Sequence, residues 1–271
     1  METPDKLKDL VRQKYGEIAL QEQDGCCSSA TSCCGPEGAK VEVYNIMSES
    51  YEQLEGYNPD ADMGLGCGLP TQFARISKGD TVVDLGSGAG NDCFVARAET
   101  GETGRVIGLD FTPHMIDRAR ANAKKLGYTN VEFIYGDIED MPIPDATANV
   151  VVSNCVLNLV PDKEQAFSEV FRILKPGGHF SISDIVLRGD LPEKLQSAAE
   201  MYAGCVAGAI QKDDYLGLVR GAGFVDLHIQ KEKEILVPEN ILLQYLTEEE
   251  LETYRSREGG IFSITLFGRK P

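Results

Sequence analysis

The chain has 271 residues, of which 42% are hydrophobic, enough to bury a sizeable core within one large domain. Lys and Arg number 26 against 43 Asp and Glu, which gives a formal net charge of -17. This acidic balance argues against binding to nucleic-acid phosphates or to an anionic membrane surface, and it favours a small-molecule partner.

The N-terminal sequence carries no sign of export. Residues 1–10, METPDKLKDL, are charged and lack the apolar stretch of a signal peptide, and nowhere do about 18 consecutive apolar residues occur. We therefore predict a cytoplasmic protein that does not enter a membrane. Because cytoplasmic thiols stay reduced, the eight cysteines indicate metal, metalloid or redox chemistry rather than a disulfide framework.

The first part of the chain combines a helix with a cysteine-rich loop. Apolar residues recur near the helical period over residues 5–20, DKLKDLVRQKYGEIAL. Residues 24–40, DGCCSSATSCCGPEGAK, break every periodicity with Gly, Ser and Pro. We predict that residues 1–70 form a helical and cysteine-rich cap segment and that residues 71–271 form the main domain.

From residue 80 onward, strand-like runs alternate with helix-like ones. Thr112 as N-cap with Pro113 in the first helical position marks one helix start, and LKPGG ends the helix before the fifth strand. The alternation predicts an α/β fold with a mainly parallel sheet. Strands are predicted at 81–85, 105–110, 131–137, 149–154, 179–187 and 259–271, and helices at 91–100, 113–127, 163–174, 200–209 and 238–256.

The first strand-to-helix turn, VVDLGSGAG at residues 82–90, is glycine-rich. Glycines let backbone approach a ligand closely, but flavin, nicotinamide and S-adenosylmethionine proteins all use such turns. Asp110 ends the next strand, where a carboxylate can bind ribose hydroxyls. Asp137 and Ile138 follow the third strand and suit an adenine ring. The nicotinamide alternative is weaker, because the third glycine of G-x-G-x-x-G is missing.

The motifs VVDLGSGAG, VIGLD, GDIEDMP and FRILKPGG together resemble those of class I S-adenosylmethionine-dependent methyltransferases across roughly residues 71 to 235. The resemblance implies a Rossmann-like, seven-stranded, mainly parallel sheet with helices on both faces, an antiparallel final strand pair, and S-adenosylmethionine as cofactor. The cofactor-binding residues that it implies are Asp84, Gly86, Ser87, Gly88, Gly90, Asp110, Phe111, Met115, Asp137, Ile138 and Asn154.

Three scattered cysteines follow or precede elements of this sheet. Cys67 lies in a glycine-rich loop before the first strand, Cys155 ends the fourth strand, and Cys205 follows the fifth. In this fold the three regions converge where the methyl group is presented. Burial alone would explain any one of them, and we interpret Cys93 in that way. Three thiolates together suit a soft trivalent centre such as arsenic(III).

The N-terminal doublets Cys26-Cys27 and Cys33-Cys34 offer an alternative, a structural zinc site. Adjacent cysteines are awkward ligands for one tetrahedral ion, so this reading is disfavoured. The three histidines, His114, His179 and His228, form no recognisable acid-base arrangement and are interpreted as surface or structural residues.

The motifs GLGCGLP, SNCVLNLVPDK and GCVAGA, with an N-terminal YG before the cysteine loop, resemble the arsenite S-adenosylmethionine methyltransferases over nearly the whole chain. The resemblance implies methylation of arsenite and methylarsenite, and hence arsenic detoxification. It implies Cys67, Cys155 and Cys205 as arsenic(III) ligands and catalytic residues. It also implies a fourth cysteine in the loop, which forms a disulfide with Cys67; the two doublets leave Cys26, Cys27, Cys33 and Cys34 open, and we favour Cys33 or Cys34. A thioredoxin- or glutathione-type reductant would then reopen that disulfide.

Two other functions stay open at this point. A methyltransferase that acts on carbon of a quinone or another small molecule would share the FRILKPGG core, and cysteine substitutions would barely change its activity. A non-catalytic metalloid-binding protein would bind arsenic(III) tightly without turnover. The intact glycine turn and Asp110 argue against this second alternative.

Overall fold

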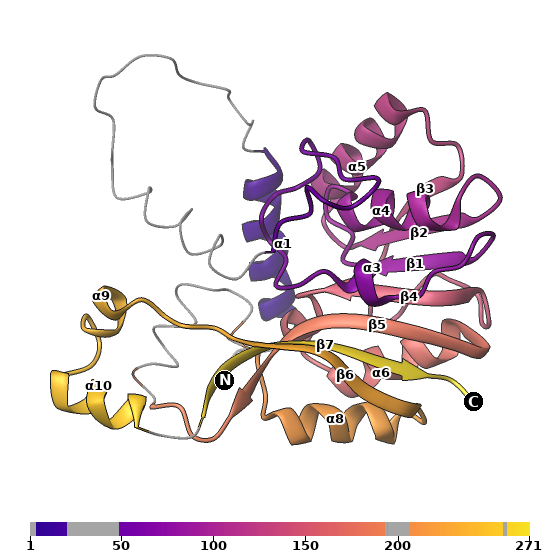
Figure 1. Ribbon diagram of the computed structural model, residues 1–271. Helices are drawn as coiled ribbons and strands as arrows, with labels where there is room; N and C mark the ends of the chain where they lie inside the picture. The colour runs from indigo at the N-terminus through magenta and orange to yellow at the C-terminus, as the bar shows by residue number, and fades with distance from the viewer. Residues whose placement is uncertain (1–3, 21–48, 193, 195–205, 207, 257–258) are drawn as a thin grey trace, which may run out of the picture.

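The computed structural model describes residues 4–20, 49–192, 194, 206, 208–256 and 259–271. Within these residues seven strands form one sheet in the order β3-β2-β1-β4-β5-β7-β6 (Figure 1). The strands are β1 (Thr81–Leu85), β2 (Arg105–Asp110), β3 (Val131–Tyr135), β4 (Ala148–Asn154), β5 (Leu174–Arg188), β6 (Val225–Glu234) and β7 (Gly260–Arg269). The predicted seven-stranded Rossmann-like sheet is confirmed.

The first five strands run parallel, and the last two pair antiparallel. β1 pairs with β2 and β4, β2 with β3, and β4 with β5, all in parallel. β7 lies between β5 and β6 and is antiparallel to both. The strand predicted at the end of the chain therefore joins the same sheet, although in an inner position.

Helices cover both faces of the sheet, which explains the nearly unbroken apolar sequence of the central strands. They are α3 (Pro70–Phe73), α4 (Asn91–Thr100), α5 (Pro113–Leu126), α6 (Lys163–Ile173) and α8 (Lys212–Gly221), with a short 3-10 turn η1 (Leu157–Leu159) after β4. In β4, Val151 packs with Phe167 of α6 on one face, whereas Val150 and Val152 pack with Phe94 of α4 on the other. Alternate side chains of one strand thus build two cores.

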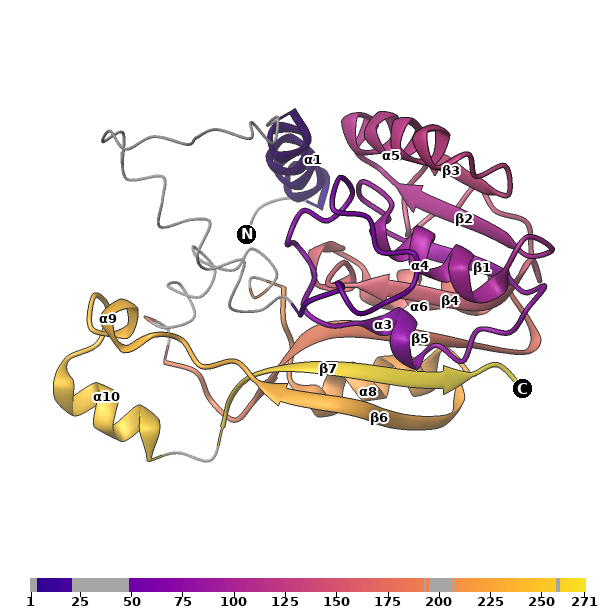
Figure 2. The same ribbon diagram turned by 45° about the horizontal axis from the view of Figure 1, so that its top comes forward.

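The N-terminal helix α1 (Pro4–Leu20) packs against α5, as Figures 1 and 2 show. Val11 is buried, and Gly16 lies against the side chains of Thr112 and His114. Leu10 and Leu20 are 57% and 61% exposed, so only part of the apolar stripe is used. The predicted cysteine-rich loop, with Cys26, Cys27, Cys33 and Cys34, lies outside the described residues, as does most of the predicted 200–209 helix.

One predicted helix is wrong. Instead of a single helix over residues 238–256, the structure has α9 (Glu239–Leu242) and α10 (Glu248–Arg255). Thr247 begins the second helix through a capping box, in which its hydroxyl accepts from the Glu250 amide at 3.2 Å and its own amide donates to the Glu250 carboxylate at 2.9 Å. The cap satisfies the first amides of α10 and favours a new start there. Both helices lie beyond the ends of β6 and β7 (Figure 2).

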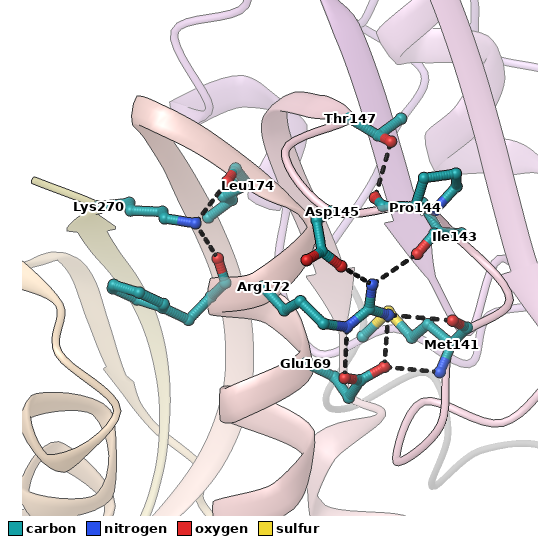
Figure 3. Close-up of polar contacts among 10 residues, drawn as sticks. Met141, Ile143, Pro144, Asp145, Thr147, Glu169, Arg172, Leu174 and Lys270 are labelled. Carbon is teal, nitrogen blue, oxygen red and sulfur yellow. Dashed lines mark hydrogen bonds and ion pairs between the residues drawn. The ribbon is translucent and has the colours of Figure 1, made fainter.

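The loop between β3 and β4 is fixed by one arginine of α6. The Arg172 guanidinium donates to both Glu169 oxygens, at 2.6 and 2.7 Å, and to the carbonyls of Met141 and Ile143 at 3.0 and 2.8 Å (Figure 3). It also bonds Asp145 at 2.7 Å. These contacts raise the pKa of Arg172, and the hydrogen bonds from Arg172 lower the pKa of Glu169. The loop that follows Asp137 and Ile138 is therefore anchored by a charge-assisted network.

None of the described helices is long and apolar enough to cross a bilayer. The predicted division at residue 70 stays a prediction. Residues from both sides of it, such as Tyr51 and Asp84, line one common cavity.

Candidate functional site

A cavity lies at the carboxyl ends of β1, β2 and β4 and is bordered by α1. It encloses about 1080 Å³, open solvent at its mouth included. This is the edge of a parallel α/β sheet at which ligands bind. The predicted site residues that line it are Asp84, Gly86, Ser87, Gly88, Asp110, Phe111, Met115, Asp137, Ile138, Asn154 and Cys155.

The glycine turn between β1 and α4 brings backbone close to this cavity. Gly86 has φ +67°, and a Cβ there would collide with Val156. The Gly88 amide donates to Asp110 at 2.9 Å. The buried hydroxyl of Ser87 has no hydrogen-bond partner among the described residues, although it lines the cavity. Gly90, predicted to bind the cofactor, is the N-cap of α4 and is not among the lining residues.

Two carboxylates line the cavity near its glycine turn: Asp84, which is buried in β1, and Asp92, which is half-buried in the first turn of α4. Burial raises the pKa of Asp92 to about 6, and burial and the neighbouring Asp92 charge raise that of Asp84. The Cys93 thiol donates to Asp84 at 3.2 Å, and burial raises the thiol's own pKa. Cys93 is buried as predicted, but it also bonds a cavity residue. Two carboxylates at one wall favour a cationic ligand group.

Two more predicted acids, Asp110 and Asp137, also line the cavity. Asp110, at the end of β2, accepts hydrogen bonds from the Thr112 amide at 2.8 Å and from Gly88, while burial raises its pKa. Asp137 binds the Lys8 ammonium at 2.7 Å and the Glu139 amide at 3.0 Å, and Lys8 also pairs with Glu139. The predicted adenine acceptor is therefore tied to α1.

Two predicted arsenic ligands lie in one apolar cluster. Cys155 comes directly after β4 with φ +62°, and its amide donates to Ser183 of β5 at 2.8 Å. Cys67 is 1% exposed and Cys155 2%, and both pack with Ile185, which lies 30 residues beyond Cys155. Val206 belongs to the same cluster. Cys205, the third predicted ligand, lies outside the described residues.

A buried polar pair lies near these thiols. The Tyr215 hydroxyl donates to Asp184 at 3.1 Å, and both side chains are fully buried. Burial raises the pKa of Asp184 to about 7. It also raises that of Tyr215, and the charges of Asp184, Cys67 and Cys155 raise it further. Nothing in the sequence pattern indicated this pair.

Several cavity residues were missed at the level of sequence. α1 contributes Lys8, Val11 and Tyr15, and the segment before β1 contributes Tyr51. Asp92 was also missed, although its place in GNDCF, one residue after the turn, could have marked it. Tyr51 stands in SESYEQLEG, which carries no such signal.

The histidines take structural positions, as predicted. His179 contacts the Ala74 carbonyl at 2.6 Å and stacks on Phe267, and His228 contacts the Asp226 carbonyl at 3.0 Å. His114 is exposed beside α1. Within the described part of the chain, no group of three or more His, Cys, Asp and Glu side chains is arranged to hold a metal ion.

The residues present fit S-adenosylmethionine. The Ser87 hydroxyl can bond the cofactor, because it has no partner among the described residues. The carboxylates of Asp84 and Asp92 suit its cationic amino group, and Asp110 lies at the strand end where ribose hydroxyls commonly bind. The sheet order and this cavity define a Rossmann-like, S-adenosylmethionine-dependent class I methyltransferase, and the family described as "Methyltransferase domain" matches residues 76–223.

The particular family follows from three relatives. The arsenite methyltransferase of Halobacterium salinarum is 38% identical over 99% of this chain and 68% of its own length. That of Aquipseudomonas alcaligenes is 30% identical over 92% and 71%. A crystal structure of an arsenic(III) S-adenosylmethionine methyltransferase from Chlamydomonas reinhardtii superimposes with TM-score 0.61 and 36% identity, over 74% of this chain and 66% of that one. The chain belongs to the arsenite methyltransferase family.

Proposed function

We propose that this protein transfers methyl groups from S-adenosylmethionine to arsenic(III) and so detoxifies arsenic. The observation that carries the proposal is the packing of Cys67 and Cys155, 88 positions apart, in one buried cluster; Cys155 also lines the cavity, whereas Cys67 does not. Family membership supplies the substrate, because the relatives are named as arsenite methyltransferases.

The cavity residues then bind and orient the cofactor, which when bound supplies an electrophilic sulfonium methyl group. Asp84 and Asp92 attract its cationic amino acid end, and the Ser87 hydroxyl offers a hydrogen bond there. Asp110 accepts from ribose hydroxyls. Asp137 and Ile138 contact the adenine, and Phe111 and Met115 provide apolar surface beside it. Gly86 and Gly88 have no side chains, so the backbone of the turn can approach the cofactor closely. Support comes from the position of these residues around one cavity.

Cys67, Cys155 and Cys205 hold the substrate. Arsenous acid exchanges its three hydroxyls for three sulfurs, so that three S–As bonds form and three waters leave with the thiol protons. The arsenic lone pair then points away from the sulfurs, and methylation needs positioning rather than a general base. Val206, next in sequence to Cys205, packs in the cluster of Cys67 and Cys155, which supports a third thiol at this place.

Methylation formally oxidises arsenic by two electrons. We infer that the thiol of Cys33 or Cys34 attacks the Cys67 sulfur: the S–As bond of Cys67 breaks and leaves its electron pair on arsenic, the attacking thiol loses its one proton, and a disulfide forms. An external thiol of the thioredoxin or glutathione class reopens it by exchange. This cycle requires reduced thiols, in keeping with the predicted cytoplasmic location. Methylarsenite re-enters as a second substrate when a thiol set is regenerated.

Anaerobic single-turnover methylation tests the proposal. Reduced protein, S-adenosylmethionine and arsenite are mixed, and arsenic species are separated by chromatography. The wild type should give methylated arsenic, whereas Cys155→Ser and Cys205→Ser should lose at least about tenfold in rate, because one S–As bond is missing. Cys93→Ser, which removes a buried thiol outside the cluster, is the matched control and should remain active.

Three results would contradict the proposal. Full turnover by Cys155→Ser would show that the thiolate site is wrong. If the cofactor binds but neither the wild type nor any variant forms methylarsenic, the assignment as a class I methyltransferase stands and arsenic is not its substrate. Quinone-like acceptors would then be tested. Tight arsenite binding without turnover would instead indicate sequestration.

A further inference from the structure

The side chain of Asn154 lies between the cavity and the Cys67 loop. Its carbonyl oxygen accepts from the Cys67 amide at 2.9 Å, and its NH2 group donates to the Gly68 carbonyl at 2.8 Å. The same NH2 group contacts the Tyr51 hydroxyl at 2.6 Å and Asp92 at 3.3 Å. Asn154 was predicted to bind the cofactor, but these protein groups already engage both ends of its amide.

Tyr51 completes the connection to the cavity. Its hydroxyl donates to Asp92 at 2.8 Å and also lies 3.2 Å from the Gly68 carbonyl. Thr71 adds a hydrogen bond to the other oxygen of Asp92 at 3.2 Å. Asp92 lines the cavity, whereas Cys67 belongs to the thiol cluster. A continuous, partly buried set of hydrogen bonds therefore joins the cavity wall to the backbone of a predicted arsenic ligand.

The loop fits tightly on this network. A Cβ at Gly66 would lie 2.5 Å from the Asn154 amide nitrogen. Such packing leaves little room for the loop to shift unless Asn154 shifts with it. Changes at Asp92 and changes at Cys67 are thus mechanically linked.

We propose that Asn154 and Tyr51 are positioning residues that couple cofactor binding at Asp92 to arsenic(III) binding at Cys67. This inference rests on the proposed function, because it takes Cys67 as an arsenic ligand. A cationic ligand group at the cavity wall stabilises the charged Asp92 carboxylate, which is the acceptor that the Tyr51 and Asn154 donors need. With those donors fixed, the Cys67 amide and the Gly68 carbonyl are held in place. Coupling of this kind is reciprocal, so arsenic also tightens cofactor binding.

A second anchor of the same loop provides a matched control. The Ser263 hydroxyl of β7 donates to the Cys67 carbonyl at 2.5 Å. Ser263 is not among the described residues that line the cavity, and its hydroxyl bonds Cys67 rather than Tyr51, Asn154 or Asp92. Its loss should loosen the loop without cutting the connection.

The experiment measures arsenite affinity of the reduced full chain by anaerobic equilibrium dialysis, with and without saturating S-adenosylhomocysteine. In the wild type the nucleotide should tighten arsenite binding by about fivefold or more. Tyr51→Phe removes one hydroxyl and keeps the ring, so that only the 3.3 Å contact between Asn154 and Asp92 still joins the two sites. Its ratio should fall well below the wild-type value while both ligands still bind. Ser263→Ala should bind arsenite more weakly in both conditions with the wild-type ratio.

The reverse titration, nucleotide affinity with and without arsenite, must return the same ratio. Asn154→Ala serves as a second variant, with thermal unfolding as the check on its fold. A wild-type ratio near one, or a ratio that Tyr51→Phe retains, overturns the coupling. Arsenite binding that is absent, or that Cys155→Ser leaves unchanged, overturns the proposed function itself, so the two failures are distinguishable.

Discussion

The two loops that border the cavity are held by different chemistry. The loop after β3, which carries Asp137 and Ile138, is fixed by ions: the Arg172 guanidinium inside the loop and the Lys8 ammonium from α1. The Cys67 loop is fixed by neutral side chains: the Asn154 carbonyl oxygen accepts from the Cys67 amide, and the Tyr51 and Ser263 hydroxyls donate to loop carbonyls. A lysine or arginine beside the thiols would favour thiolates permanently and lower their pKa. Neutral anchors hold the loop without that effect.

The two loops also differ in how far the residues that hold them are exposed to solvent. The Lys8 and Asp137 side chains are 22% and 36% exposed, whereas Cys67 is 1% exposed. Ionic anchors near solvent respond to salt, and buried neutral ones do not. The comparison therefore predicts that the two ends of the site can be weakened separately.

The largest effect at a fixed pH is expected at Arg172. Arg172→Met removes five hydrogen bonds, leaves the carbonyls of Met141 and Ile143 without that donor, and leaves the Glu169 carboxylate with the Met141 amide alone. We expect a loss of about 2–3 kcal/mol in the free energy of unfolding and weaker cofactor binding, with arsenite affinity unchanged. Chemical denaturation and nucleotide titration measure these. Arg105→Met, which breaks an exposed pair with Glu132, is the control and should cost under about 1 kcal/mol. An equal loss in both variants would contradict the assigned role.

The next effect concerns pH and the thiol side. Burial raises the pKa of Asp184 to about 7, against which Ile185, Lys163 and Tyr215 act only partly. A carboxyl with a raised pKa in the folded state stabilises that state fully below its unfolded pKa of about 4. This contribution disappears as pH rises through 7. Relative to Asp184→Asn, the wild type should therefore lose up to about 1.4 kcal/mol per pH unit between pH 4 and 7.

Denaturant unfolding of both proteins across that pH range, without arsenic, gives the difference. Above about pH 8 the difference should be constant. Parallel curves for the two proteins between pH 4 and 7 would show that Asp184 titrates near its ordinary value. Glu164→Gln serves as a control, because it also removes one carboxylate but at an exposed position of α6, next to Lys163.

The smallest effect is expected at Lys8. Because its pair with Asp137 is partly exposed, Lys8→Met should weaken cofactor binding by about two- to fivefold, equivalent to less than 1 kcal/mol. Raising the salt concentration should do the same to the wild type and little to the variant. Calorimetric titration with S-adenosylhomocysteine at two salt concentrations measures both. A variant that keeps the wild-type salt response would show that this pair does not act on the cofactor end.

The sequence predicted the parts of the fold that local pattern controls. The bounds of β1 and β2 agree with the predicted runs to the residue, because β-branched stretches there stop at a glycine turn or an acid. The prediction of one helix over 238–256 was wrong because it rested on apolar periodicity and not on Thr247 and Glu250, which form the capping box of α10. A cap of two residues outweighed the longer pattern.

The site divided in the same way. Asp84 and Asp110 could be placed because they end strands whose carboxyl edge is a general binding position. Lys8 and Tyr51 could not be placed from the sequence, because they lie far from the other cavity residues along the chain and approach them only in the folded structure. The convergence of Cys67 and Cys155 was implied by a family resemblance, and periodicity alone left burial as an equal explanation.

The backbone of Cys155 has an evolutionary consequence. With φ at +62°, this position favours glycine and asparagine, and most other side chains are strained there by about 1 kcal/mol or more. A library of all substitutions at residue 155, selected for folding alone, should therefore enrich Gly and Asn over Ala. Under arsenic, selection should return Cys. The thiol would then persist only in lineages that meet the metalloid, and the codon at this position would record that exposure.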